Sequence, residues 1–323
     1  MAEVKVEPIE EYGLSKKDRS KTLFSKVGIV GCGSVGQAIA RNISCRGIEV
    51  VFIELSEALI KQAIESIDNQ LELTIQRWGM TPAEKRGIIS RIRGTLNYKD
   101  LSDCDLVIEA ILSKSRETSV GIRKEVFRRI EKHVSPDAII TTNSTTLVIT
   151  ELSSELEHKE RCVSLHFSTT SPDAAILEVA RGLYTSDEAY EKVLTFGKLL
   201  SKVVIPVEES PGLISVRMLV VIINEACQIL VEKVADKEDI DLTISSSLSS
   251  KQGPFEMADR IGLDRLLRYM DNLYNEFGDI RYKANPIIKR LVRANQLGRK
   301  TCKGFYEYDE NGNRIREHSL LKH

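Results

Sequence analysis

Three closely spaced glycines open the part of the sequence that could bind a nucleotide. Gly31, Gly33 and Gly36 stand between an apolar run and an alanine-containing run that is typical of a helix. In a dinucleotide-binding turn the first glycine allows a tight bend, the second lets a pyrophosphate approach the backbone, and the third lets helix pack on strand. The phosphates would lie on the first turn of the helix, at Ser34 and Val35, where unpaired N–H groups favour negative charge. An ordinary strand-to-helix turn can carry the same glycines, so the choice between the two interpretations depends on the residues that follow.

The acidic residue that such a turn requires follows at a suitable distance. Residues 50–53 form a second apolar run, which ends at Glu54, 18 residues beyond Gly36. A carboxylate there can accept a hydrogen bond from the 2′-hydroxyl of the adenosine ribose, whereas it repels a 2′-phosphate. The pattern therefore predicts a dinucleotide site that takes NAD rather than NADP.

A histidine and a glutamate twelve residues apart are candidate acid–base groups. His166 lies in the predicted strand 162–167, and Glu178 lies in the next, 175–180. When a nicotinamide accepts hydride from an alcohol, the site also needs a base for the proton, and histidine suits this role. A carboxylate on the far ring nitrogen would orient the imidazole and stabilise its charged form. The spacing alone leaves a second interpretation open, in which His166 is a core histidine and Glu178 an edge charge.

Strands and helices alternate through the first two thirds of the chain. Strand–helix–strand units at this spacing pair in parallel and form a doubly wound sheet. Ligands bind such a sheet at the carboxyl ends of its strands, where Gly31, Glu54, Glu109 and Asn143 fall. Besides the strands above, the pattern predicts strands at 104–110, 138–143 and 203–207, and helices at 58–77, from a cap at Thr81 to about Arg93, at 115–133 and from about Ser186.

The remainder of the chain is predicted to be helical. Pro211-Gly212 marks the expected boundary, and the next helix, 213–231, carries apolar residues on every face. A helix of that kind has to be buried on all sides, and one small helical domain cannot cover it, so we expect a homodimer through this helix. The predicted architecture is α/β: a polar extension at 1–25, a Rossmann-type NAD-binding domain at 26–209 and an all-helical substrate and dimerisation domain at 210–323.

Composition excludes several classes of function. A net charge of −1 gives no general attraction for nucleic acid or an anionic membrane, and the longest apolar runs are far below the ~20 residues of a membrane-spanning helix. The six cysteines form no C-x-x-C pair and no cluster with the five histidines, so neither a metal site nor a disulfide framework is expected. The N-terminus has no signal-peptide core, and a reducing cytoplasmic location fits best.

These motifs together resemble the 3-hydroxyacyl-CoA dehydrogenase family, and most of all its short bacterial 3-hydroxybutyryl-CoA dehydrogenases. The similarity extends from about Lys26 to Tyr308. It implies reversible, NAD-dependent oxidation of a 3-hydroxyacyl-CoA, expected to be short-chain, with acyl-CoA bound between the two domains. Besides the Gly31 turn, the matching stretches are 79–81, 104–110, 142–143, 165–167, 177–179, 253–259, 262–264 and 297–301.

The resemblance also implies roles for individual catalytic residues. The catalytic histidine and glutamate of the family fall on His166 and Glu178. Its hydroxyl that faces substrate and nicotinamide falls on Thr145, where the family usually has serine. These three residues are the predicted catalytic group, with histidine as the general acid/base.

On the cofactor side, the resemblance places two basic residues. A lysine that contacts the cofactor falls on Arg123, once a short insertion around 113–118 is allowed, and a further cofactor-side lysine matches Lys300. Glu109 and Asn143, at the ends of their strands, complete the predicted cofactor contacts.

Three departures from the family pattern leave alternatives open. The family's run His-Phe-Phe-Asn-Pro corresponds to residues 166–170, where Thr169 replaces the asparagine. Its run Asn-Thr-Ser-Ser corresponds to residues 143–146, which read Asn-Ser-Thr-Thr. Its run Val-Asn-Arg corresponds to Ser215-Val216-Arg217, where valine replaces the asparagine. Two active-site amides are therefore absent, although nearby hydroxyls could replace them. One alternative is a dinucleotide-binding protein with little turnover and a structural or regulatory role. The other is a dehydrogenase that acts on a different hydroxy acid or thioester.

Overall fold

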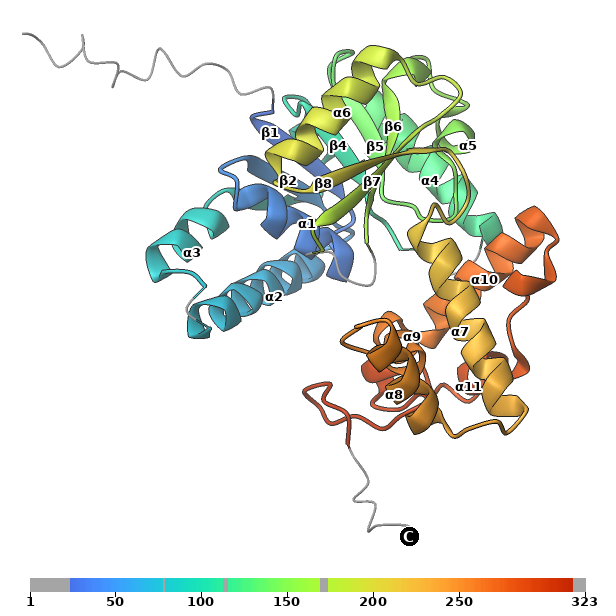
Figure 1. Ribbon diagram of the computed structural model, residues 1–323. Coiled ribbons are helices and arrows are strands. Elements are labelled where there is room, and N and C mark those ends of the chain that lie inside the picture. Colours follow the sequence, from blue (N-terminus) through green and yellow to red (C-terminus); the bar gives the residue numbers. More distant parts are fainter. Residues whose placement is uncertain (1–23, 78, 113–115, 169–173, 316–323) are drawn as a thin grey trace, which may run out of the picture.

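A computed structural model describes residues 24–77, 79–112, 116–168 and 174–315, and Figure 1 shows their arrangement. The strands are β1 (Lys26–Val30), β2 (Glu49–Ile53), β3 (Ile92–Thr95), β4 (Leu106–Glu109), β5 (Ile139–Thr142), β6 (Cys162–Phe167), β7 (Ile176–Arg181) and β8 (Val203–Glu208). The helices are α1 (Ser34–Ser44), α2 (Glu57–Gln76), α3 (Pro82–Ile89), α4 (Arg116–Glu131), α5 (Ile149–Ser153), α6 (Asp187–Leu199), α7 (Ser215–Val231), α8 (Lys237–Ser247), α9 (Pro254–Ile261), α10 (Leu263–Phe277) and α11 (Pro286–Arg293).

The eight strands form one sheet in the order β3-β2-β1-β4-β5-β6-β7-β8. Neighbours from β3 to β6 are parallel, β7 is antiparallel to β6, and β8 is parallel to β7. The chain moves outward from β1 in both directions, so the order reverses between β1 and β4. A crevice opens at such a point, at the carboxyl ends of the strands. The predicted Rossmann-type, doubly wound sheet is thus confirmed.

Helices cover both faces of the sheet. Ile43 of α1 and Phe196 of α6 belong to the apolar core on one face, whereas Phe127 of α4 and Leu152 of α5 belong to the core on the other. Strands enclosed in this way need apolar side chains on both sides, which explains their nearly continuous apolar sequences. We call this layered region, up to about Ser210, the sheet part.

The helix predicted from Thr81 to about Arg93 is too long, and one strand was missed. Thr81 does cap α3, but the helix ends at Ile89 and the chain then forms the edge strand β3. The strand has only four residues, of which only Ile92 is buried, so it carries no alternating pattern. Gly94 in its middle lies against the Phe52 ring, where a Cβ would be 2.8 Å from the nearest ring atom.

Helices α7 to α11 and the segment to Tyr308 have a core of their own, and we call them the helical part. Figure 1 shows this bundle beside the sheet part, to which α7 connects it. Within the single chain α7 is covered on one side only, as expected if one small helical domain cannot bury it alone. Val220 and Ile223 are buried, but Met218 is 59% and Val231 49% exposed, because the small bundle covers only one side of the helix. Among the described helices, none has the length and apolar character to cross a membrane.

Candidate active site

The glycine turn between β1 and α1 has the geometry that a bound pyrophosphate requires. Gly31 has φ +94°, and a Cβ on Gly36 would lie 2.2 Å from the Gly31 carbonyl oxygen, so both positions exclude larger residues. A Cβ on Gly33 would meet no atom within 4 Å, which leaves the backbone open to a ligand. Helix α1 has no side-chain cap and no acidic residue in its first turn, so the N–H groups at Ser34 and Val35 can bind an anion.

Glu54 lies beside this turn at the end of β2. One carboxylate oxygen accepts a hydrogen bond from Cys32 N at 2.6 Å, which fixes the acid against the glycine backbone. Gly31, Gly33 and Glu54 line a cavity of about 770 Å³. The same cavity is bordered by Leu55, which is 91% exposed, and by other exposed apolar side chains, namely Leu96, Leu112 and Ile122. An acid on a ribose hydroxyl beside an apolar surface suits adenosine, so the residues present fit a dinucleotide.

Thr145, His166 and Glu178 form a hydrogen-bonded series at the carboxyl ends of β5 and β6. The antiparallel register of β6 and β7 places His166 opposite Glu178, and their side chains meet at 3.0 Å between Nδ1 and Oε2. Nε2 lies 3.1 Å from the Thr145 hydroxyl oxygen. All three side chains are buried. A carboxylate on Nδ1 makes Nδ1 the protonated nitrogen of a neutral imidazole, so Nε2 is the atom that can take up a proton.

The first turn of α7 holds the Glu178 carboxylate. Ile214 N and Ser215 N donate to Oε1 at 3.0 and 3.1 Å, and the Ser215 hydroxyl donates to Oε2 at 2.6 Å. Burial alone would raise the pKa of Glu178, but the hydrogen bonds from His166 and Ser215 outweigh it and lower the pKa to about 2. Glu178 is therefore ionised at neutral pH. The stability that the ionised Glu178 carboxylate adds to the fold is fully present above the ordinary pKa of a glutamate. It is lost as the pH falls through about 2, the pKa of Glu178 in the folded protein.

Glu109 and Arg123, which are both predicted to contact the cofactor, pair with each other. Arg123 forms an ion pair with Glu109, which is completely buried, and also donates to the Ile111 carbonyl oxygen. The other oxygen of Glu109 accepts from the Thr142 hydroxyl at 2.7 Å. This pair fixes the loop after β4, which forms one wall of the crevice. Residues 113–115 of the predicted insertion lie outside the described residues.

A small cavity of about 90 Å³ lies next to Thr145. Asn143 is on its wall, and its side-chain oxygen accepts from Phe167 N at 2.7 Å, so this amide joins the ends of β5 and β6. From the opposite side, Asn272 of α10 donates to the Thr146 hydroxyl at 2.7 Å. The helical part therefore closes the space in front of the catalytic group.

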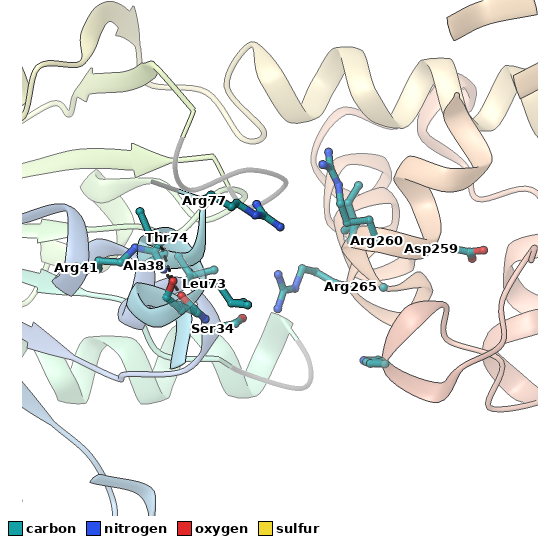
Figure 2. Close-up of a pocket in the computed structure, with 14 residues that line it drawn as sticks. Ser34, Ala38, Arg41, Leu73, Thr74, Arg77, Asp259, Arg260 and Arg265 are labelled. Carbon is teal, nitrogen blue, oxygen red and sulfur yellow. Dashed lines mark hydrogen bonds between the residues drawn. The ribbon is translucent and has the colours of Figure 1, made fainter. Parts of the chain in front are cut away.

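Basic side chains line a larger cleft, of about 720 Å³, between α1 and the helical part. Figure 2 shows Arg77 reaching from the sheet part toward Arg260 and Arg265 of α9 and α10. The carboxylate of Asp259 points away from them and accepts hydrogen bonds from the C-terminal segment. Burial, and then the nearby Arg299, lower the pKa of Arg260. The cleft thus holds cations close together, which a polyanionic ligand would stabilise. Sequence reasoning missed these three arginines.

Lys300 lines the same cleft as Ser34 and Val35. Its ammonium group lies 2.6 Å from a carboxylate oxygen of Asp264, and the side chain as a whole is half exposed. The structure therefore brings the predicted cofactor lysine to the side of the cleft that faces the first turn of α1.

The residues that depart from the family pattern fall into three situations. Val216 is 2% exposed and packs into the core of the helical part. The Ser215 hydroxyl is bound to Glu178, on the side of His166 away from Thr145. Thr169 and Thr170 lie outside the described residues.

A doubly wound sheet with a dinucleotide turn, and a buried histidine–glutamate pair at its crevice, define an NAD-dependent oxidoreductase. Residues 26–210 match the NAD binding domain of 3-hydroxyacyl-CoA dehydrogenase, and residues 212–308 match the C-terminal domain of the same enzyme. The chain belongs to the 3-hydroxyacyl-CoA dehydrogenase family, and its cofactor is NAD.

Individual relatives match over nearly their whole length. A 3-hydroxybutyryl-CoA dehydrogenase of Clostridioides difficile is 35% identical over 285 residues, which is 88% of this chain and 100% of that protein. The solved (S)-3-hydroxybutyryl-CoA dehydrogenase of Ralstonia eutropha has a TM-score of 0.79 at 35% identity, over 88% of this chain and 99% of its own. FadB2 of Mycobacterium tuberculosis has a TM-score of 0.84 at 30% identity, over the same shares.

Proposed function

We propose that the protein catalyses the reversible oxidation of a short-chain 3-hydroxyacyl-CoA, such as 3-hydroxybutyryl-CoA, to the 3-ketoacyl-CoA. The observation that carries this proposal is the buried series Thr145–His166–Glu178 at the crevice between the two parts. The cavity next to Thr145, of about 90 Å³, suits a short acyl group. The names of the relatives from Clostridioides difficile and Ralstonia eutropha support the same chain length.

Each member of the catalytic group has one role in the proton transfer. The nicotinamide of NAD, when bound, supplies the hydride acceptor. His166 Nε2 takes the proton of the 3-hydroxyl during oxidation and returns it during reduction. Glu178 holds the ring through Nδ1 and stabilises the imidazolium. Thr145, whose hydroxyl lies 3.1 Å from Nε2, positions the substrate oxygen beside the imidazole.

The cations of the cleft account for binding of the CoA part. CoA carries a pyrophosphate and a further phosphate on its ribose, and guanidinium groups bind phosphate oxygens in pairs. We assign this role to Arg77, Arg260 and Arg265, which lie on both sides of the cleft. NAD would approach from the other end, along Ser34, Val35 and Lys300.

The test is a panel of substrates assayed by formation or loss of NADH. We expect the highest kcat/KM on 3-hydroxybutyryl-CoA and acetoacetyl-CoA, a higher KM on the pantetheine thioesters that lack the CoA phosphates, and little turnover of free hydroxy acids. Inactivity on every thioester would support a structural or regulatory protein. Preference for a free hydroxy acid would support the other alternative. None of the six cysteines, all of which lie in the described part of the chain, forms a disulfide, which fits a reducing compartment such as the cytoplasm.

Cofactor choice gives a prediction at Glu54. Glu54→Ala removes the acceptor for the ribose 2′-hydroxyl and the charge that repels a 2′-phosphate. The affinity for NAD should therefore fall, and the difference in affinity between NAD and NADP should become smaller. Fluorescence titration with NADH and NADPH measures both. Glu57→Ala, an exposed change of equal charge on α2, should leave the preference intact. A wild type that prefers NADP would contradict the assignment.

We also propose the division into an NAD domain at 26–209 and a helical domain at 210–323 that forms a homodimer through α7. The exposed apolar side chains Met218 and Val231 on α7, with Val234 and Leu242 beyond it, supply a surface for a second copy. Sedimentation velocity at micromolar concentration should give twice the 36.3 kDa of one chain, and Met218→Lys should weaken the assembly. A stable wild-type monomer would refute the dimer.

A further inference from the structure

Ser215 lies where the helical part meets the catalytic group of the sheet part. It is the first residue of α7, in the helical part, and its hydroxyl donates to Glu178 Oε2, in the sheet part, at 2.6 Å. The same oxygen accepts from His166 Nδ1 at 3.0 Å. The serine hydroxyl and the imidazole therefore share one acceptor atom.

We propose that Ser215 is a positioning residue, which fixes Glu178 Oε2, and through it the His166 imidazole, when the helical part is docked on the sheet part. The inference rests on the proposed function, since it concerns the same acid–base pair. It assigns to this chain a donor that the family pattern lacks, because the family has valine at this place and asparagine at the next, where this chain has Val216.

The contacts of the carboxylate explain why this donor matters. Oε1 accepts from two backbone amides at the start of α7, whereas Oε2, among the described residues, contacts the side chains of His166 from β6 and Ser215 from α7. Across β8 the register partner of Glu178 is Ile205, which has no polar side-chain atom. Without the serine hydroxyl, Oε2 would be free to move together with the imidazole and would no longer hold the ring in one orientation. Hydrogen bonds to a charged acceptor are also stronger than neutral ones, which favours one orientation of the carboxylate.

A pair of isosteric variants separates this role from simple packing. Ser215→Val and Ser215→Thr have the same shape, but only threonine keeps the hydroxyl. We expect the valine variant to lose about 10-fold in kcat, the scale of one hydrogen bond to a charged group, with KM and NAD affinity little changed. The threonine variant should recover most of the loss. Equal kcat for the two variants would overturn the proposal.

A thermodynamic cycle tests whether the effect passes through Glu178. In a Glu178→Ala background the valine and threonine variants should have the same kcat, because the shared acceptor is gone. A difference that persists there would mean that Ser215 acts elsewhere, which contradicts the proposal.

The same four variants, with valine or threonine at 215 and glutamate or alanine at 178, also test the contact between Ser215 and Glu178 in the absence of substrate. In urea unfolding, the stability difference between threonine and valine at position 215 should be larger with Glu178 than with alanine at 178. Absence of this coupling would overturn the contact itself. If the variants showed this coupling but the wild type were inactive on every thioester, the contact between Ser215 and Glu178 would stand and the proposed function would fail.

Discussion

His166→Gln should lower turnover by about 100-fold to 10,000-fold, the usual contribution of general acid–base catalysis. Glutamine can still bond to Glu178 and Thr145, but it cannot take up the substrate proton. NAD affinity should change little, because His166 does not line either of the two cavities that the glycine turn and the start of α1 border. Stopped-flow or steady-state assays with a 3-hydroxyacyl-CoA measure the first effect, and NADH fluorescence titration measures the second.

The matched control for this substitution is His158→Gln. The His158 side chain is 41% exposed and lies 3.4 Å from Glu160, on the surface of the sheet part. We expect its turnover to equal that of the wild type. If His166→Gln kept wild-type turnover, the assignment of the general base would be wrong. If both substitutions reduced NAD affinity equally, the loss would reflect the fold rather than the chemistry.

Most of the sheet could be predicted because its central strands are buried on both faces. Short, fully apolar runs such as 50–53 and 106–108 are typical of strands buried between two layers of helices, and α2 and α7 lie within two residues of their predicted bounds. The edge strand β3 could not be predicted from its pattern. It has one buried residue and a central glycine, and its conformation depends on pairing with β2.

The site was predicted only as far as neighbouring strands could be recognised. Consecutive strands predicted that His166 and Glu178 could meet, but their contact depends on the antiparallel register of β6 and β7. A slip of one residue would place the two side chains on opposite faces. The contribution of Ser215 and the cluster of Arg77 with Arg260 could not be found in this way, because packing of the helical part brings distant residues together.

Breaking the buried pair of Glu109 and Arg123 should destabilise the sheet part by about 3–5 kcal/mol, the usual cost of leaving one buried charge without its partner. Arg123→Met leaves the Glu109 carboxylate, which has no exposed surface, with the Thr142 hydroxyl and Ile111 N as its remaining donors among the described residues. Urea unfolding measures the loss. Lys61→Met, which removes one partner of an exposed ion pair with Glu65, should cost about 0.5 kcal/mol or less.

Two further variants show whether the charge or the shape of the Arg123 side chain accounts for the loss of stability. Arg123→Lys introduces the lysine of the family pattern, but one ammonium group cannot replace a guanidinium that also contacts the Ser119 hydroxyl and the Ile111 carbonyl oxygen. We therefore expect an intermediate loss of stability. The double variant Glu109→Gln/Arg123→Met should lose less than the sum of the two single changes, since no unpaired charge remains. A loss below about 1 kcal/mol for Arg123→Met, together with weaker NAD binding, would instead mean that Arg123 serves the cofactor directly.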